Sequence, residues 1–159
     1  MNEDADALRV WFRLLRVGNR IRVAMAARLR RIELSLPQCD VLTTLTEEEG
    51  ISQQDLAKKL YVTKGNISGL VDRLTDARLV ERRSIDGDRR SHALYLTEAG
   101  RGLALEGIAA QRDFVARSLG RMDRAKLVQF EALLGDLRTL VREAVAADAG
   151  AAGPGEQQA

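Results

Sequence analysis

The sequence predicts a mainly α-helical fold with one small β-hairpin. Two short segments with good helix-start signals stand close together in the centre of the chain, and a hairpin sequence follows them. Longer segments on both sides carry apolar residues at helical spacing. A chain of 159 residues is long enough for one domain with additional helices at its ends.

Residues 6 to 32 are expected to form one long helix. Leu8, Trp11 and Leu15 mark one apolar stripe on it, and Val10 and Leu14 begin a second stripe. Two stripes predict that the helix is buried on more than one side. The segment also contains an arginine cluster, which a solvated helix face would explain as well as a binding role. The cluster comprises Arg9, Arg13, Arg16, Arg20, Arg22, Arg28, Arg30 and Arg31.

The centre of the chain predicts a helix-turn-helix. A helix with Pro37 in its first turn ends at Gly50, a short helix begins after Ser52, and a third begins after Thr63. Ser and Thr are good N-caps, so both short helices have a defined start. The buried face of the third helix is expected to contain Ile67, Leu70, Val71 and Leu74, and its outward face Lys64, Gly65, Asn66, Ser68, Gly69, Asp72 and Arg73.

A β-hairpin is expected directly after the helix-turn-helix. Residues 79–84 and 93–96 have the pattern of short strands, and the Asp86-Gly87 step between them is a hairpin signal. Arginines crowd this region. A helix-turn-helix followed by a protruding cationic hairpin is the arrangement of a winged helix, which can contact DNA at two grooves.

Two more helices are expected at the C-terminal end. Thr97 caps one that runs to about residue 119, and Asp123 caps the other. The last helix has apolar residues in alternating steps of three and four, which is the spacing of a coiled-coil seam. They are Leu127, Phe130, Leu134, Leu137, Val141 and Ala144. Residues 146–159 are rich in Ala, Gly and Gln and are expected to be a disordered tail.

These elements, in this order, resemble the MarR family of bacterial transcriptional regulators over residues 8 to about 142. The wing signature carries most of the resemblance: Asp88-x-Arg90 is followed by Leu96-Thr97-x-x-Gly100. The other matching segments are 36–42, 54–57, 63–74 and 79–82.

The resemblance implies a winged helix-turn-helix domain with N- and C-terminal dimerisation helices. Residues 1–34 would form the first dimerisation helix, residues 35–100 the DNA-binding lobe and residues 101–145 the C-terminal dimerisation helices. It further implies a homodimer, usually a repressor, that binds a pseudo-palindromic double-stranded operator and that a small molecule releases.

The helix that begins after Thr63 and the wing supply the candidate DNA contacts. Asn66 can pair with adenine, Lys64 can reach guanine or phosphate, and a wing arginine such as Arg90 can enter the minor groove with Asp88 supporting its guanidinium. Arg73 is a phosphate contact or forms an internal salt bridge, for example with Asp88. The full set of expected DNA contacts is Gln53, Thr63, Lys64, Asn66, Ser68, Arg73, Arg89 and Arg90.

The dimer interface is expected to comprise Leu8, Trp11, Leu15, Leu127, Phe130, Leu134, Leu137 and Val141. A cleft for an aromatic or anionic effector is a second interpretation of this region, although packing in the dimer core explains Trp11 and Phe12 better. Its candidate residues are Trp11, Phe12, Arg16, Cys39 and Asp40, with Arg20 beside them.

The chain departs from the family pattern at three positions. Arg78 stands where the family usually has Gly after the recognition helix, so we expect a different helix end, since a left-handed non-glycine residue costs about 1–2 kcal/mol. Gly69 replaces a longer DNA-contacting residue, and Cys39 replaces an aromatic one.

Two alternative functions remain open. Cys39 would be the sensor of a thiol-redox-gated regulator, although a buried structural cysteine explains its position better. A degenerate winged helix would serve as a protein-interaction module, which the retention of Lys64, Asn66, Arg89 and Arg90 disfavours.

Other function classes find no support in the sequence. A lone His92 and a lone cysteine make no metal site, and we expect no cofactor and no catalytic constellation, hence no enzyme. The single cysteine suits a reducing compartment. The acidic N-terminus does not resemble a secretory signal and no apolar run reaches the length of a membrane span, so the cytoplasm is the expected location.

Overall fold

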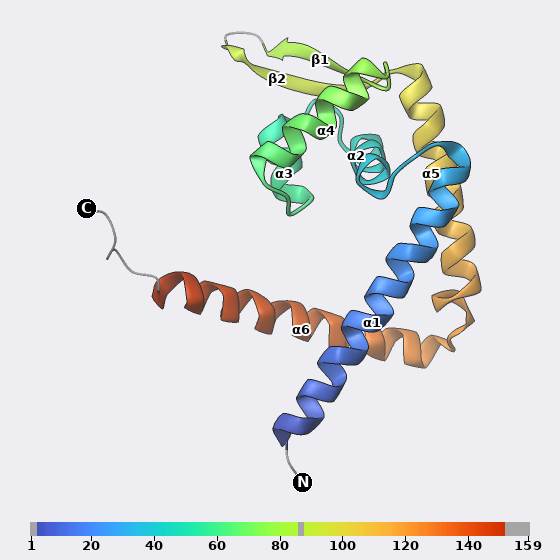
Figure 1. The fold of residues 1–159 in the computed structure, drawn as a ribbon, viewed down its shortest axis with the longest axis vertical. Helices are drawn as coiled ribbons and strands as arrows, with labels where there is room; N and C mark the ends of the chain where they lie inside the picture. The colour runs from blue at the N-terminus through green and yellow to red at the C-terminus, as the bar shows by residue number, and fades with distance from the viewer. Residues whose placement is uncertain (1–2, 86–87, 152–159) are drawn as a thin grey trace. The chain divides into compact units, whose positions relative to one another are not determined.

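The predicted fold class is confirmed by the computed structural model, which describes residues 3–85 and 88–151. In that part of the chain the regular elements are helices and a single two-stranded hairpin, which lies beside α4 (Figure 1). Residues 1–114 and residues 115–159 form two compact units. The elements are α1 (Glu3–Leu29), a 3₁₀ turn (Arg30–Ile32), α2 (Leu36–Glu47), α3 (Gln53–Lys59), α4 (Lys64–Asp76), β1 (Val80–Ile85), β2 (Asp88–Leu96), α5 (Glu98–Arg117), a second 3₁₀ turn (Leu119–Arg121) and α6 (Arg124–Ala151).

The helix starts are set by side chains that satisfy free backbone N–H groups. Ser52 Oγ accepts from the Asp55 amide at 3.1 Å and Thr63 Oγ1 from the Asn66 amide at 3.3 Å, so both caps of the helix-turn-helix are confirmed. Asp123 caps α6 through the Lys126 amide at 2.9 Å. The sequence reading missed the capping box at Ser35, in which the side chain of Gln38 also contacts the cap.

The apolar core lies where α2, α3, α4 and the hairpin meet. Its largest fully buried side chains are Leu29, Leu34, Leu42, Leu45, Leu56, Ile67, Leu74 and Leu94. The predicted buried face of α4 is confirmed, because Ile67, Leu70, Val71 and Leu74 all lie in this core. Burial of such side chains stabilises the lobe by about 1.5–3 kcal/mol each.

The hairpin has a third, very short partner. β1 and β2 pair antiparallel from Val80 opposite Leu96 to Ser84 opposite His92, and the register shifts after Ser84. On the other edge of β2, the Gly50 amide donates to the Leu94 carbonyl at 2.8 Å and the Leu94 amide to the Ile51 carbonyl at 3.0 Å. The wing is therefore anchored to the loop that leads into α3.

The end of α4 keeps a left-handed residue, so our expectation of a different helix end at Arg78 is wrong. Arg78 has φ 55°, its amide donates to Thr75 and the Leu79 amide to Leu74, both at 2.9 Å. These two bonds form a Schellman motif. The Arg78 carbonyl also accepts from Thr97 Oγ1 at 2.7 Å. The extra hydrogen bonds offset the cost of placing a side chain at a left-handed position.

Two predicted boundaries are also corrected. β2 begins at Asp88 rather than at residue 93, because ladder hydrogen bonds need no apolar side chain and the strand therefore continues through the charged residues. α6 continues to Ala151 rather than ending before residue 146, since alanine is the best helix former. The rest of the predicted tail, 152–159, and the turn residues Asp86 and Gly87 lie outside the described residues.

None of the described helices is both long enough and apolar enough to cross a lipid bilayer.

The junction between α4, β1 and α5 depends on a glycine. Thr97 caps α5 by accepting from the Gly100 amide at 3.0 Å, and its own amide donates to the Leu79 carbonyl at 3.1 Å. A Cβ on Gly100 would lie only 1.8 Å from that carbonyl oxygen. No side chain fits there unless the backbone moves. The Leu-Thr-x-x-Gly signature is thus the sequence of a helix that starts in contact with the end of the recognition helix.

We predict that Gly100→Ala destabilises the protein by more than about 3 kcal/mol, because the added methyl group overlaps backbone rather than a flexible side chain. Gly102→Ala is the matched control, since a Cβ there has no neighbour within 4 Å. The control should be neutral or stabilising by up to about 1 kcal/mol, because both residues lie in α5 and alanine favours helix. Urea unfolding at one protein concentration measures both. Equal midpoints would contradict the prediction.

Candidate nucleic-acid interface

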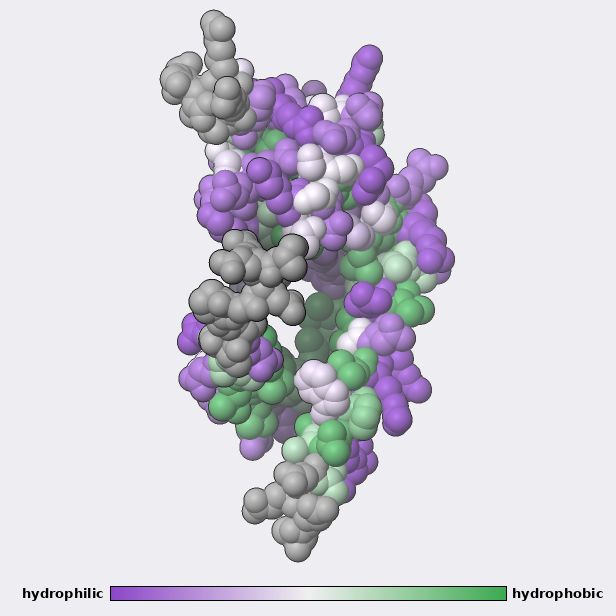
Figure 2. All heavy atoms as spheres, turned by 60° about the vertical axis from the view of Figure 1, so that its left-hand side comes forward, coloured by the Kyte–Doolittle hydropathy of each residue, from purple (hydrophilic) through white to green (hydrophobic). Residues whose placement is uncertain are grey.

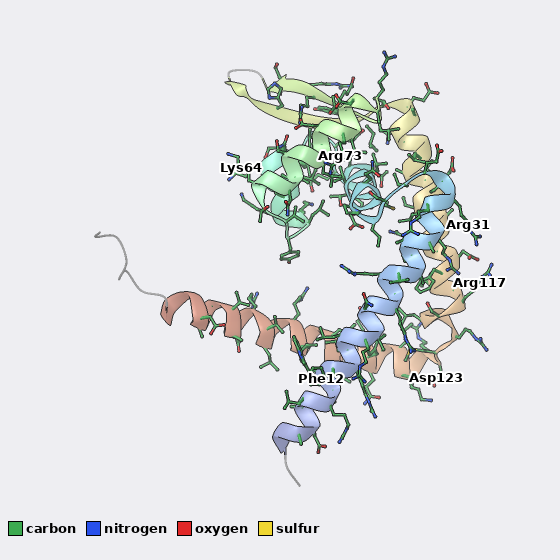
Figure 3. The ribbon with its side chains drawn as sticks, in the orientation of Figure 1. Phe12, Arg31, Lys64, Arg73, Arg117 and Asp123 are labelled. Atoms are coloured by element: carbon green, nitrogen blue, oxygen red, sulfur yellow. The ribbon has the colours of Figure 1, made fainter. Side chains whose placement is uncertain are left out.

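The outward face of α4 is free of the core and polar. Lys64, Gly65 and Asn66 are exposed at its first turn, and Lys64 points away from the lobe (Figure 3). Ser68 and Gly69 are half-buried and Arg73 is exposed farther along the helix. The helix N-terminus adds partial positive charge at the end where Lys64 lies. This face therefore presents donors and positive charge together, which suits a nucleic acid.

Gly69 leaves room for Arg73 on this face. The nearest atom to a Cβ built on Gly69 is Arg73 Nη1, at 3.7 Å. The Arg73 guanidinium thus lies back along the helix over Gly69. The alternative of an Arg73–Asp88 salt bridge is untested, because the Asp88 side chain lies outside the described residues. No ion pair joins Arg73 to any acidic side chain that the structure describes.

An ion pair connects α4 to the hairpin. Arg82 on β1 forms a salt bridge with Asp72 on α4, and its guanidinium donates to Gln53 Oε1 on α3 at 3.4 Å. Arg82 therefore joins three elements of the lobe. It also neutralises an acidic side chain on the outward face of α4, which would otherwise repel phosphate. Sequence reasoning missed this role, although an aspartate on the outward face of a recognition-type helix indicates that a cation lies nearby.

The predicted contact Gln53 is therefore partly engaged within the lobe. It is half-buried at the start of α3 and its side-chain oxygen faces Arg82. Thr63 is exposed but its hydroxyl caps α4. Their roles in DNA binding stay predictions, as does that of Ser68.

The hairpin carries its arginines in two groups. Near its base, Arg83 lies over the Tyr95 ring, with its guanidinium carbon 4.1 Å from the ring centre, and its Nε donates to Glu81 at 2.9 Å. Toward the tip, the backbone of residues 88–91 belongs to β2, but the side chains of Asp88, Arg89 and Arg90 lie outside the described residues. The assignments to these three residues stay predictions.

A carboxylate secures the base of the wing. Glu49 Oε1 accepts from the Leu96 amide at 2.9 Å and from the Arg101 guanidinium at 2.9 Å. The Leu96 hydrogen bond, more than Arg101, holds the pKa of Glu49 below its usual value. Glu49 thereby satisfies the last amide of β2, beyond the reach of the short third strand. The acidic run 47–49 therefore has a structural role that the sequence did not reveal.

Cys39 is a core residue. Its side chain is fully buried, Gln111 Nε2 lies 3.7 Å from Sγ, and a Cβ on Gly107 would be 2.8 Å from the same sulfur. Burial, and secondarily the Asp40 carboxylate, raises the pKa of the thiol to about 11. A reactive sensor thiol needs the opposite shift. The structure thus supports the buried structural cysteine over the redox sensor.

The predicted effector residues are not brought together within one chain. Cys39 packs near Leu29, at the C-terminal end of α1. Trp11 lies 18 residues earlier on the same helix, about 27 Å along its axis. Phe12 is likewise on the N-terminal half of α1 (Figure 3). A hollow of about 510 Å³ lies between the end of α1 and the start of α2. It is lined by Ala26, Arg30 and residues 33–38, so none of the predicted effector residues lines it.

The helix-turn-helix, its hairpin and the polar outward face of α4 together define a winged-helix DNA-binding lobe. The family model that matches the sequence, over residues 32–91, is that of the MarR family. The chain is 32% identical over 133 residues to the HTH-type transcriptional repressor Rv2887 of Mycobacterium tuberculosis, and the match covers 84% of this chain and 96% of that repressor. The chain therefore belongs to the MarR family, and it is a transcriptional regulator rather than an enzyme.

Two further relatives extend this comparison. The chain is 32% identical over 108 residues to the HTH-type transcriptional regulator TtmR of Methylorubrum extorquens, a match that covers 68% of this chain but only 53% of TtmR. Among solved structures, CouR from Rhodococcus jostii RHA1 bound to p-coumaroyl-CoA has a TM-score of 0.72 and 28% sequence identity, with 80% of this chain and 90% of that chain covered.

We predict that native Cys39 reacts with a thiol reagent such as DTNB at pH 8 at least about 100-fold more slowly than the urea-unfolded protein. A pKa near 11 instead of 9 lowers the thiolate fraction by about that factor, and burial slows access further. Absorbance of the released thionitrobenzoate measures both rates. Similar rates, or peroxide-sensitive DNA binding that Cys39→Ser abolishes, would instead favour the redox-gated regulator.

Proposed function

We propose that this protein is a cytoplasmic homodimer that represses transcription by binding a pseudo-palindromic operator, and that a small-molecule effector releases it. The DNA-binding part of this proposal rests on the outward face of α4. Lys64 and Asn66 are exposed at the first turn, and Arg82 offsets one acidic side chain of this face by pairing with Asp72.

Uncovered apolar side chains support the dimer. On α1, Leu8, Trp11 and Leu15 are each about half exposed, at 55%, 47% and 48%. In Figure 2, hydrophobic side chains extend along α1 from the grey N-terminal residues at the bottom of the view. On α6, Leu127, Phe130, Leu134 and Val141 of the predicted seam are exposed and Leu137 is partly so.

Monomeric proteins rarely leave contiguous apolar surface of this kind in water. A second copy of the chain is the simplest cover for it, because a two-fold dimer would also place two α4 helices at half-sites about 34 Å apart. The division of the chain into residues 1–34 and 101–145 for dimerisation and 35–100 for DNA binding follows from this proposal.

The effector is supported by similarity. CouR, at 28% identity, was crystallised bound to p-coumaroyl-CoA, so one relative of this chain takes a small molecule. Protein-interaction by a degenerate winged helix is disfavoured because the exposed polar face of α4 is intact.

We predict that the purified protein binds the DNA upstream of its own gene saturably, with excess unrelated competitor present, and that affinity falls steeply as salt rises. Arg90→Ala should weaken this binding at least about tenfold, the loss expected for one minor-groove arginine. Fluorescence anisotropy measures both proteins. The matched control is Arg112→Ala, an exposed arginine on α5, which should bind like wild type.

Wild-type affinity in the Arg90 variant would remove the wing assignment. Loss of all binding to competitor would mean that the operator lies elsewhere or that the lobe serves a protein partner.

We predict that Leu134→Asp combined with Leu137→Asp yields monomers that lose operator binding, because buried carboxylates oppose the apolar seam. Sedimentation velocity reports the oligomeric state. Ala132→Asp combined with Thr139→Asp is the control, since these exposed residues lie on the opposite side of α6 and should leave the dimer intact. A seam variant that stays dimeric would place the interface elsewhere.

A further inference from the structure

The N-terminal helix has an unusual charge distribution. Residues 7–32 contain eight arginines and no acidic residue, although the whole chain has a net charge of only +2. Six of these arginines lie on α1 and two on the 3₁₀ turn that follows it, so positive charge is dense along a segment outside the DNA-binding lobe proper.

Four of these arginines form a single stripe, Arg9, Arg13, Arg16 and Arg20. Their steps of four, three and four residues place them within an arc of about 60° on the helix, over a length of about 16 Å. All four side chains are exposed. Like charges three and four residues apart repel one another along a helix. An arrangement of this kind is destabilising unless an anion lies against it.

Acidic side chains near the stripe neutralise little of its positive charge. Asp6 pairs with Arg9 at 2.8 Å, but Arg13, Arg16 and Arg20 have no acidic partner among the side chains that the structure describes. The helices that a second copy would bring are balanced: α5 has three acidic and three basic residues, and α6 has four of each. These two helices would therefore bring no excess of negative charge to the stripe.

The stripe also lies far from the DNA-binding surface. Arg16 is 13 residues before Leu29, the α1 side chain buried in the core, which is about 20 Å along the helix axis. In Figure 1 the N-terminal half of α1 extends away from α3, α4 and the hairpin. Operator DNA bound by α4 is not the anion that this stripe would face.

A hollow lies against the stripe. It measures about 390 Å³ and is lined by Arg13, Arg16, Val17, Asn19 and Arg20. Guanidinium groups bind phosphate oxygens in bidentate geometry, and three arginines line this hollow. Phe12, half exposed and one turn before Arg16, offers an aromatic surface next to the charges.

We propose that Arg13, Arg16 and Arg20 form a binding site for a small molecule that carries two or more phosphate groups, with Phe12 and Val17 contacting an apolar part of the same molecule. The site names the chemical class of the effector, and so it rests on the proposed function. Phosphates would supply the missing negative charge, and the apolar part would cover exposed side chains on both sides of the stripe.

Isothermal titration calorimetry of the full chain without DNA tests the site. The probes are benzoyl-coenzyme A, which carries both features, inorganic pyrophosphate, which carries only phosphate, and benzoate, which carries neither phosphate nor a comparable charge. We expect saturable binding of benzoyl-coenzyme A, weaker binding of pyrophosphate and none of benzoate. Arg16→Gln combined with Arg20→Gln should weaken benzoyl-coenzyme A binding at least tenfold.

The control variant is Arg22→Gln combined with Arg112→Gln, which removes the same charge from positions off the stripe and should bind within twofold of wild type. No binding by wild type, or an equal loss in both variants, would overturn the proposal. So would dissociation of the stripe variant in sedimentation, which would show that the arginines pair with a second copy. Stripe-dependent binding to phosphatidylglycerol vesicles without binding of either soluble phosphate compound would assign the surface to a membrane and equally overturn it.

Operator titration of the same samples distinguishes failure of the ligand site from failure of the proposed function. Normal operator binding with no ligand binding would reject only this site. Ligand binding without operator binding would leave the site and count only against the tested operator or the DNA-binding part of the proposed function.

Discussion

The close contact between Gly100 and the Leu79 carbonyl is the constraint on which the DNA-binding lobe depends. It lets α5 begin directly against the end of α4, so that Thr97 can hydrogen-bond both the Arg78 and Leu79 carbonyls. The left-handed turn at Arg78 is then held both by its own backbone hydrogen bonds to α4 and by those from Thr97. Because β1 leaves the same turn, this contact also sets the direction in which the wing projects from the recognition helix.

Charged side chains then fix the wing against that junction. Arg82 connects β1 to α4 and α3, and Glu49 connects the end of β2 to α5. Each pair is partly exposed, so its contribution to folding stability is small. Its contribution to geometry is larger, because a winged helix must present its helix and its hairpin at a fixed separation to reach two grooves. Pairing with Arg82 also reduces the negative charge on the outer surface of α4, where Lys64 and Arg73 are exposed.

The N-terminal helix has a different character from the lobe. Its last turns reach the core through Met25 and Leu29, whereas its first twenty or so residues combine exposed apolar side chains with arginines. The exposed apolar side chains of this helix suit contact with a protein partner, and its concentrated positive charge suits binding of an anion. Dimerisation and effector binding would both use side chains of the same turns of α1, which gives a route by which one could influence the other.

The sequence by itself determined the fold class, the order of the elements, the helix caps at Ser52, Thr63 and Asp123, and the buried face of α4. Each of these depends on local spacing or on a cap that acts within three residues, so it can be predicted from the sequence of a short segment. Only the tertiary structure decided that Arg78 stays left-handed, that Arg82 neutralises Asp72, that Glu49 closes the wing and that Cys39 is separated from Trp11. These outcomes depend on contacts between residues that are distant in the sequence. Rules based on residue spacing do not specify the geometry of such contacts.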